Sequence, residues 1–170
     1  MENFKEISVF DIENVQKLIG KDWMLISAGK LGEGYNTMTA SGGSMGGLWN
    51  KPGCTVYIRP QRFTYLFAEA NEEMTMCFFD EDKRDVLRFC GSHSGRDFDK
   101  AKECSLTPVS VSDGKAVIFE EARLARICRK LYASDIKEEC FIDKSLLSNY
   151  AEKDYHRQYI CEITKVLVRA

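Results

Sequence analysis

The residues with the clearest chemical potential form a short run from Asn36 to Ser41, Asn-Thr-Met-Thr-Ala-Ser. The run combines three hydroxyl groups, one amide and one thioether, and it carries no charge. A strand that only fills a core is enriched in Val, Ile or Phe instead. Four glycines follow within six residues, at positions 42, 43, 46 and 47, and glycine lets a ligand approach the backbone closely. The run therefore suggests a site for a flat ligand that forms hydrogen bonds.

The two faces of this run differ, because alternate residues of a strand point to the same side. The hydroxyl groups of one face belong to Thr37, Thr39 and Ser41, whereas the other face carries Asn36, Met38 and Ala40. A row of hydroxyl groups can equally line a solvent-exposed face, and the glycines can equally form a mobile loop. Both alternatives stay open from this segment alone.

A first basic segment, Arg59-Pro-Gln-Arg62-Phe-Thr64, could bind a phosphate group. Its two guanidinium groups flank a rigid proline, and Thr64 is predicted to cap the start of a helix. A helix N-terminus offers unpaired N–H donors to an anion, and arginine binds phosphate oxygens in a bidentate manner. The alternative is a solvated basic turn with a routine threonine cap.

A second basic segment follows further along the chain, where Ser94, Gly95, Arg96 and Lys100 lie close in sequence. A hydroxyl group, a glycine turn and two cations could form a second phosphate site. The alternative is an ordinary surface loop in which neighbouring aspartates pair with Arg96 and Lys100. Taken with the uncharged strand, the two basic segments predict a mononucleotide, which has a flat polar head and a phosphate tail.

Composition limits the remaining possibilities. The chain has 170 residues, 44% of them hydrophobic and 29% charged, which predicts one globular domain over residues 1–170. The net charge of −2 does not suggest a nucleic-acid partner. Seven cysteines without a Cys-x-x-Cys pair, and an N-terminus without an apolar signal core, suggest a cytoplasmic protein. Neither a membrane span nor a metal site is expected, since Cys90-Gly-Ser-His93 lacks a second half-site.

Hydrophobic spacing predicts the elements that position these residues. Short apolar runs predict strands at residues 23–28, 35–41, 55–58, 74–79, 109–111, 116–119 and 158–168. Helices are predicted at residues 10–19 (ended by Gly20), 64–70, 97–103 and 144–150, and from Asp80 or Asp82 to Phe89. Residues 121–132 fit helical spacing, but a long strand is the alternative. Neighbouring strands and a Ser112-Asp-Gly114 hairpin predict a mainly antiparallel barrel with peripheral helices.

Familiar catalytic motifs are missing from the sequence. It contains no dinucleotide fingerprint, no P-loop and no Gly-x-Ser-x-Gly elbow. Of the two histidines, His156 is the better acid–base candidate, because it immediately precedes the last predicted strand. A histidine in that position is nevertheless more often a surface residue than a proton donor.

Four motifs in this order resemble the flavin reductase-like family, and most of all its flavoredoxin branch. They are Asn36-Thr-Met-Thr-Ala-Ser41, Leu48-Trp-Asn-Lys-Pro52, Ile58-Arg-Pro-Gln-Arg-Phe-Thr64 and Cys90-Gly-Ser-His-Ser-Gly-Arg-Asp97. The resemblance extends from about Lys21 to the final strand. It implies a mainly β, FMN-binding split β-barrel of antiparallel Greek-key type, and a homodimer with FMN near the interface. It also implies that residues 121–132 form a strand.

The resemblance also implies roles for individual residues. The isoalloxazine and ribityl chain of FMN would contact Asn36, Thr37, Met38, Thr39, Ala40 and Ser41. The phosphate would be approached by Arg59, Arg62, Thr64, Ser94, Arg96 and Lys100. The sequence departs from the family at Gly42, where relatives usually carry a tryptophan that would shield the flavin.

The implied function is a flavin reductase-like oxidoreductase. NADH, NADPH or a redox-partner protein would supply electrons, and bound FMN would pass them to an acceptor. The alternative is a non-catalytic FMN-binding electron carrier without nicotinamide turnover of its own. In both cases the flavin performs the redox chemistry, and the protein supplies binding, orientation and electrostatics.

Overall fold

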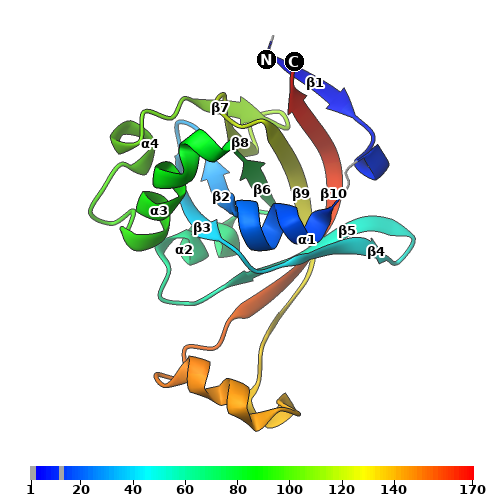
Figure 1. Ribbon diagram of the computed structural model, residues 1–170, viewed down its shortest axis with the longest axis vertical. Helices are drawn as coiled ribbons and strands as arrows, with labels where there is room; N and C mark the ends of the chain where they lie inside the picture. Colours follow the sequence, from blue (N-terminus) through cyan, green and yellow to red (C-terminus); the bar gives the residue numbers. More distant parts are fainter. Residues whose placement is uncertain (1–2, 12–13) are drawn as a thin grey trace.

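A twisted antiparallel sheet forms the body of the protein in the computed structural model, which describes residues 3–11 and 14–170 (Figure 1). Its strand order is β3-β2-β6-β9-β10-β5-β4, and β1 pairs with β10 off this path. The strands are β1 (Phe4–Ile7), β2 (Met24–Lys30), β3 (Gly34–Ala40), β4 (Ser44–Leu48), β5 (Lys51–Ile58), β6 (Glu73–Phe78), β9 (Leu124–Asp135) and β10 (Arg157–Arg169). The predicted split-barrel class is confirmed, although the sheet does not close into a complete barrel.

A separate hairpin joins β7 (Pro108–Val111) to β8 (Ala116–Phe119). Its turn contains Ser112, Asp113 and Gly114 with φ of 54°, 54° and 87°. Aspartate and glycine tolerate this left-handed backbone better than most residues. The hairpin predicted from this sequence is thereby confirmed.

Short helices cover the sheet at several points. The α-helices are α1 (Val15–Lys17), α2 (Phe63–Ala70), α3 (Arg84–Ser92) and α4 (Lys100–Glu103). Other helical turns are η1 (Val9–Asp11), η2 (Leu18–Asp22), η3 (Glu81–Lys83), η4 (Glu138–Cys140) and η5 (Lys144–Tyr150). Helix α2 packs on β2 and β3, and α3 packs on the same two strands. Within the described ranges, no helix has the length and apolar character needed to cross a lipid bilayer.

Two apolar clusters lie on opposite faces of the central strands, and β2 contributes to both. Met24 and Ile26 belong to the cluster inside the curved sheet, whereas Leu25 belongs to the cluster beneath α3 and the β7–β8 hairpin. This alternation follows the pleat of a strand. In β9, Leu124 and Cys128 likewise face the inner cluster, and Ala125 and Ile127 face the outer one.

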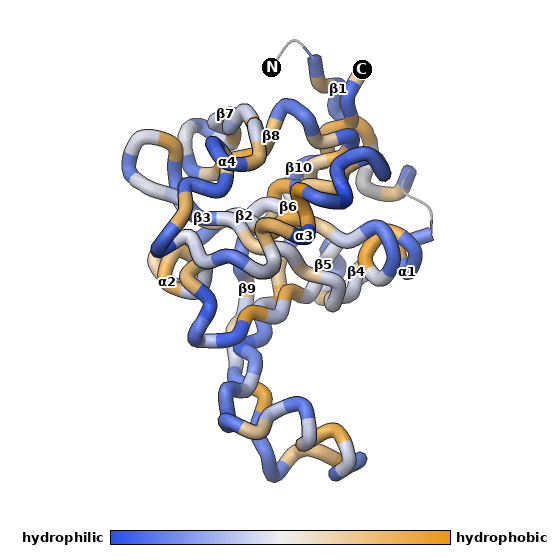
Figure 2. The backbone as a smooth tube through the Cα atoms, turned by 60° about the vertical axis from the view of Figure 1, so that its left-hand side comes forward, coloured by the Kyte–Doolittle hydropathy of each residue, from blue (hydrophilic) through white to orange (hydrophobic). Residues whose placement is uncertain are grey.

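Strands β9 and β10 continue beyond the sheet and carry residues 136–156 away from the body, a segment that we call the arm (Figure 1). Figure 2 shows that the arm combines hydrophobic and hydrophilic residues. The rings of Phe141, Tyr150 and Tyr155 contact one another within it, in edge-to-face and tilted arrangements. Ile142 and Leu146 are 100% and 48% exposed.

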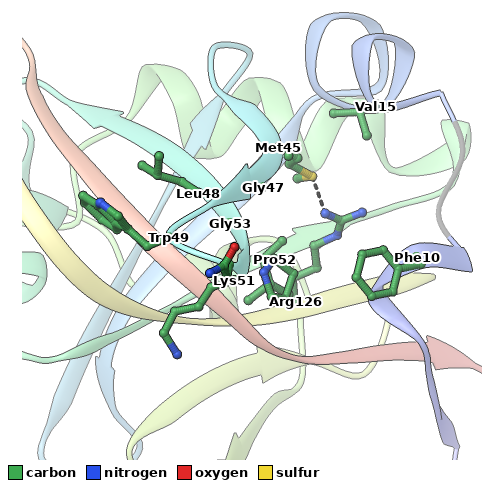
Figure 3. Close-up of a pocket in the computed structure, with 13 residues that line it drawn as sticks. Phe10, Val15, Met45, Gly47, Leu48, Trp49, Lys51, Pro52, Gly53 and Arg126 are labelled. Carbon is green, nitrogen blue, oxygen red and sulfur yellow. Dashed lines mark hydrogen bonds between the residues drawn. The ribbon is translucent and has the colours of Figure 1, made fainter.

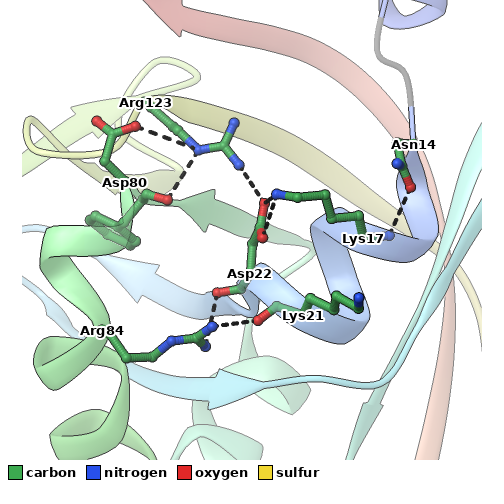
Figure 4. A network of polar contacts seen from close by, with 8 residues as sticks. Asn14, Lys17, Lys21, Asp22, Asp80, Arg84 and Arg123 are labelled. Carbon is green, nitrogen blue, oxygen red and sulfur yellow. Dashed lines mark hydrogen bonds and ion pairs between the residues drawn. The ribbon is translucent and has the colours of Figure 1, made fainter.

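Ion pairs fasten the first helical segment to the sheet, as Figure 4 shows. The carboxylate of Asp22 binds Lys17 Nζ and Arg123 Nη2, each at 2.8 Å. The side chain of Arg84 donates to the Lys21 carbonyl at 2.6 Å and lies over the ring of Trp23. These contacts hold the start of β2 against α3, and β3 pairs with β2 in turn.

Three helix predictions need correction. The helix predicted at residues 10–19 includes residues 12 and 13, which lie outside the described residues, and Gly20 does not end it, because the helical turn continues to Asp22. Thr64 does not cap α2, since Arg62 occupies the cap and Thr64 lies inside the helix. Neither Asp80 nor Asp82 caps the next α-helix directly, because η3 precedes α3.

Residues 121–132, which fit either a helix or a strand, contribute to β9 from Leu124 onward. The helical spacing was misleading because β9 lies between β6 and β10 and is covered on both faces. Residues 124–128 are all buried, so buried and exposed positions do not alternate in this part of the strand.

Candidate functional site

The polar run lies on β3, and its two faces separate as predicted. On one face, Thr37 donates to the Ile26 carbonyl at 3.2 Å, and Ser27 donates to Thr37 Oγ1 at 3.0 Å. Thr39 donates to the carbonyl of Leu87 on α3. These two threonine hydroxyl groups already have partners inside the protein, whereas Ser41, at the end of the row, is exposed.

The opposite face of β3 combines packing with one polar contact. Met38 belongs to the inner apolar cluster, and Ala40 packs against it. Asn36 Nδ2 donates at 2.7 Å to Oγ1 of Thr64, which is completely buried. This bond joins the start of β3 to α2.

A hollow of about 240 Å³, which we call the central hollow, opens where three chain segments meet. They are β3, residues 61–64 at the start of α2, and residues 92–100 between α3 and α4. The predicted site residues that line it are Asn36, Met38, Arg62, Thr64, Ser94, Arg96 and Lys100. The fold therefore brings both basic segments to the polar strand, as the mononucleotide hypothesis requires.

Two further hollows extend along β3 on either side. One, of about 320 Å³, shares Asn36 and Lys100 with the central hollow and adds Thr37. The other, of about 430 Å³, shares Ser92 with it and adds Thr39 and Ser41. A ligand longer than a phosphate group therefore has room along the strand.

Lys100 is the most deeply buried cation of the central hollow, at 6% exposure. Its ammonium group donates to the carbonyl oxygens of Thr37 at 2.9 Å and Cys90 at 2.8 Å. Burial lowers the pKa of Lys100. An ammonium group has three N–H donors, so one remains for a ligand. Lys100 thus joins β3 to α3 and keeps a positive charge at the hollow.

Arg62 and Arg96 come from the two basic segments, and each is held by a backbone carbonyl of the other segment or its flank. Arg62 donates to the Gly91 carbonyl at 3.0 Å, and Arg96 donates to the Gln61 carbonyl at 3.2 Å. The guanidinium of Arg96 also lies over the ring of Phe63, 4.9 Å from its centroid. Each guanidinium has five N–H donors, so both retain donors for an anion.

Gly95 is a site residue whose role the sequence did not reveal. A Cβ atom at this position would overlap Oδ1 of Asn36. The absent side chain therefore lets the loop close over Asn36 and complete the central hollow. The neighbouring Ser94 accepts a hydrogen bond from the backbone N–H of Arg96 at 3.2 Å, which shapes the same turn.

Arg59 was expected at the phosphate but does not line any of these hollows. Its guanidinium pairs with Asp154 at 2.6 Å, donates to the Asn149 carbonyl at 2.9 Å and lies over the ring of Tyr150. All three partners belong to the arm. The structure therefore places Arg59 at the base of the arm rather than in the site.

His156 also lies outside the three hollows. Its Nδ1 is 2.8 Å from the hydroxyl of Tyr150, and its ring meets that of Tyr57 edge to face. Burial, followed by the charge of Arg59, lowers the pKa of His156. Its contacts connect the arm to β5 and give no sign of a role at the central hollow.

Among the described residues, no group of three His, Cys, Asp or Glu side chains is arranged to hold a metal ion. The seven cysteines are free thiols. The lining of the central hollow offers hydrogen-bond donors and positive charges beside a polar strand.

Comparisons with known proteins agree with this architecture. The sequence model described as the flavin reductase like domain matches residues 18–170. No curated protein matches the chain. Among solved structures, flavoredoxin of Desulfovibrio vulgaris (Miyazaki F) is similar with a TM-score of 0.67 and 20% identity over 86% of this chain and 68% of that chain.

Two more solved structures illustrate the range of similar proteins. The FMN-binding protein from Thermus thermophilus, solved with bound p-hydroxybenzaldehyde, has a TM-score of 0.65 and 19% identity over 95% of this chain and 79% of that one. The NADH:FAD oxidoreductase of Streptomyces globisporus C-1027 has a TM-score of 0.64 and 14% identity over 88% and 74%, respectively. At such identities the similarity demonstrates the shared fold.

Proposed function

The chain belongs to the flavin reductase like domain family, whose model matches residues 18–170, and we propose from this premise that it binds FMN and acts as a flavoprotein oxidoreductase. Electrons would come from NADH, NADPH or a redox-partner protein and pass through FMN to an acceptor. The observation that carries the proposal is the meeting of Arg62, Arg96 and Lys100 at one hollow beside an uncharged polar strand.

The residues of the central hollow fit a phosphate group. Its lining contains three cations and the hydroxyl groups of Ser92 and Ser94, and no acidic side chain. Carbonyl partners fix the three cations in place, so little side-chain freedom would be lost on binding. Charge-assisted hydrogen bonds from such donors to phosphate are among the strong ones in proteins.

The adjoining part of β3 fits a flat, neutral ring system. Met38, Thr39, Ala40 and Ser41 carry no charge, and a hollow follows this end of the strand. Gly42 has open space around its Cα, because a Cβ atom at this position would meet no other atom within 4 Å. The tryptophan that the family resemblance implies at this position would shield the ring, and Gly42 provides no such cover.

The work of the protein in this mechanism is binding and orientation. When bound, FMN supplies the hydride and electron chemistry. The cations of the central hollow would anchor the phosphate and thereby hold the rest of the cofactor along β3. No proton-transferring side chain is required near the ring, which agrees with the position of His156 outside the three hollows.

A titration with two flavins tests the proposal. Purified protein is titrated with FMN and with riboflavin, which differ only in the phosphate, while flavin absorbance and fluorescence are recorded. We expect FMN to bind at least tenfold more tightly. Equal affinities would remove the phosphate assignment, and a lack of binding by both flavins would overturn the proposal.

Turnover then separates an enzyme from a carrier. Oxidation of NADH or NADPH by the FMN-loaded protein, with excess FMN as acceptor, supports a reductase. A loaded protein that oxidises neither nucleotide, yet accepts electrons from dithionite, is the electron-carrier alternative.

A homodimer with flavin near the interface is part of the same proposal. The exposed side chains of Ile142 and Leu146 on the arm supply apolar surface that a second copy could cover. Light scattering of the protein after size exclusion measures the mass, and a monomer at micromolar concentration would contradict this part.

A further inference from the structure

A separate cavity, which we call the hairpin cavity, lies against the hairpin formed by β4 and β5 (Figure 3). Its volume is about 740 Å³, within the range that binds small organic molecules. Residues 45–53 of the hairpin line it together with Phe10, Val15, Arg126 of β9 and Ile163 of β10. It shares no lining residue with the three hollows along β3.

Arg126 is the unusual member of this lining. It lies on β9 between Leu124 and Cys128, which face the inner apolar cluster, and it is only 1% exposed. Its Nη1 contacts the thioether sulfur of Met45, as Figure 3 shows. Its Nε and Nη2 are buried and have no hydrogen-bond partner among residues 3–11 and 14–170.

Such a guanidinium is costly to bury without a partner. Buried polar groups in proteins are nearly always hydrogen-bonded, and a thioether is only a weak acceptor. The neighbouring Cys54 thiol does not supply a negative charge, because the hydrogen bond with Cys128 raises the pKa of Cys54 well above its usual value. The charge of Arg126 therefore requires an anion that the described residues do not provide.

The two unpartnered atoms also indicate the shape of that anion. Nε–H and Nη2–H lie along the same edge of a guanidinium group and point in parallel directions. This edge matches the two oxygens of a carboxylate, which it binds in a bidentate manner. The free donors of Arg126 are thus the pair that recognises a carboxylate side-on.

The remainder of the lining suits an organic body. Phe10, Val15, Met45 and Ile163 contribute apolar side chains, and the lining includes no acidic residue. The other cation, Lys51, already pairs at 2.8 Å with Glu162, outside the lining. Arg126 offers a free phosphate dianion only one pair of donors, and the other cation of the lining is already paired, so the cavity favours a carboxylate attached to an apolar group.

We propose that the hairpin cavity binds a small organic carboxylate, whose carboxylate group pairs side-on with Arg126 and whose apolar part contacts Met45 and Ile163. This site goes beyond the proposed flavin site and does not depend on it. The ligand class is an aromatic or aliphatic monocarboxylate of moderate size.

Calorimetric titration with 2-naphthoate tests the proposal, with 2-naphthamide as a neutral ligand of matched shape. We expect the wild-type protein to bind the carboxylate at least tenfold more tightly than the amide. We expect Arg126→Met to lose at least tenfold in affinity for 2-naphthoate. Lys165→Met removes a charge that pairs with Glu6 outside the lining and serves as the matched control, with a change of less than threefold.

Two results of the titrations with the wild-type protein and Arg126→Met would overturn the proposal. One is a wild-type protein that binds 2-naphthoate no better than 2-naphthamide, or not at all. The other is a folded Arg126→Met variant with unchanged affinity.

Glu13, which lies outside the described residues, is a carboxylate of the chain itself, so Glu13→Gln is titrated as well. Binding by this variant alone would show that the chain supplies the partner and would also overturn the proposal.

A second measurement covers the case in which Arg126→Met does not fold. Methionine methyl groups are labelled with ¹³C, and Met45→Leu identifies the Met45 signal. We expect 2-naphthoate to shift this signal in the wild-type protein, and an unmoved signal at saturation would contradict the site. Titrations with and without FMN separate this proposal from the flavin proposal, because we expect 2-naphthoate to bind in both.

Discussion

Lys100 and Arg126 are both buried cations, but their surroundings differ. Lys100, at 6% exposure, donates to two carbonyl oxygens and joins β3 to α3. Arg126, at 1% exposure, contacts only a thioether and leaves two N–H groups unpaired among the described residues. The comparison teaches that burial of a charge does not by itself indicate a ligand. The number of unpaired N–H donors distinguishes a structural cation from one that is available to bind an anion.

Replacing each cation by methionine is the sharpest test of this difference and has the largest expected effect. Lys100→Met removes two charge-assisted hydrogen bonds and leaves two buried carbonyls unpaired, so we expect a loss of about 2–4 kcal/mol in the free energy of unfolding. Arg126→Met removes an unpaired buried charge, and we expect a change within about 1 kcal/mol in the absence of ligand. Urea denaturation of both variants measures the two values.

The two outcomes constrain each other. Similar losses for both variants would mean that Arg126 has a structural partner, and the contrast between the two cations would disappear. A stable Lys100→Met protein would mean that the Thr37 and Cys90 carbonyls find other donors.

The arginines near the central hollow provide the next test. Arg96 lies in the hollow, whereas Arg59 pairs with Asp154 in the arm. We therefore expect Arg96→Ala to weaken FMN binding about tenfold, in line with the loss of one charged hydrogen bond, and Arg59→Ala to change it less than threefold. Fluorescence titration with FMN measures both. A larger effect at Arg59 would restore the role implied by family resemblance.

Gly95 tests how closely the loop must approach β3. In Gly95→Ala the new Cβ would overlap Oδ1 of Asn36, so either the loop or the Asn36–Thr64 hydrogen bond must give way. We expect a loss of about 1–2 kcal/mol in the free energy of unfolding, together with weaker FMN binding. Gly42→Ala is the matched control, because open space surrounds that position. Equal stabilities of the two variants would refute the close approach.

Local patterns were enough to predict the strand that carries the site. The alternation of Thr37 and Met38 on opposite faces of β3 follows from the pleat, and the structure confirms it. The meeting of the two basic segments with β3 was expected only because a mononucleotide would need it. Spacing along the chain does not show which donors are used up by the protein, so the internal bonds of Thr37 and Thr39 were not foreseen.

Partners that are distant in sequence explain what could not be predicted. Asp154, which pairs with Arg59, is 95 positions away, and no pattern near Arg59 announces it. Arg126 lies in a segment whose apolar residues fit helical spacing as well as a strand. Its inward direction follows from the position of β9 between β6 and β10, which spacing along the chain does not show. The hairpin cavity therefore had no signal in the sequence.

His156 extends the comparison to a base that burial keeps neutral, and it has the smallest expected effect. Because burial lowers its pKa below the usual 6.5, the unfolded chain binds a proton more readily than the folded protein. The contribution of His156 to stability is therefore complete above pH 6.5 and is lost as the pH falls through the folded-state pKa. We expect the free energy of unfolding of the wild-type protein, relative to His156→Gln, to decrease between about pH 7 and pH 5.

Urea denaturation of both proteins at these pH values measures the difference in the free energy of unfolding. A constant difference would show that the Tyr150–His156 contact does not depend on the neutral form, and an increase towards low pH would mean that Asp154 outweighs burial at this position.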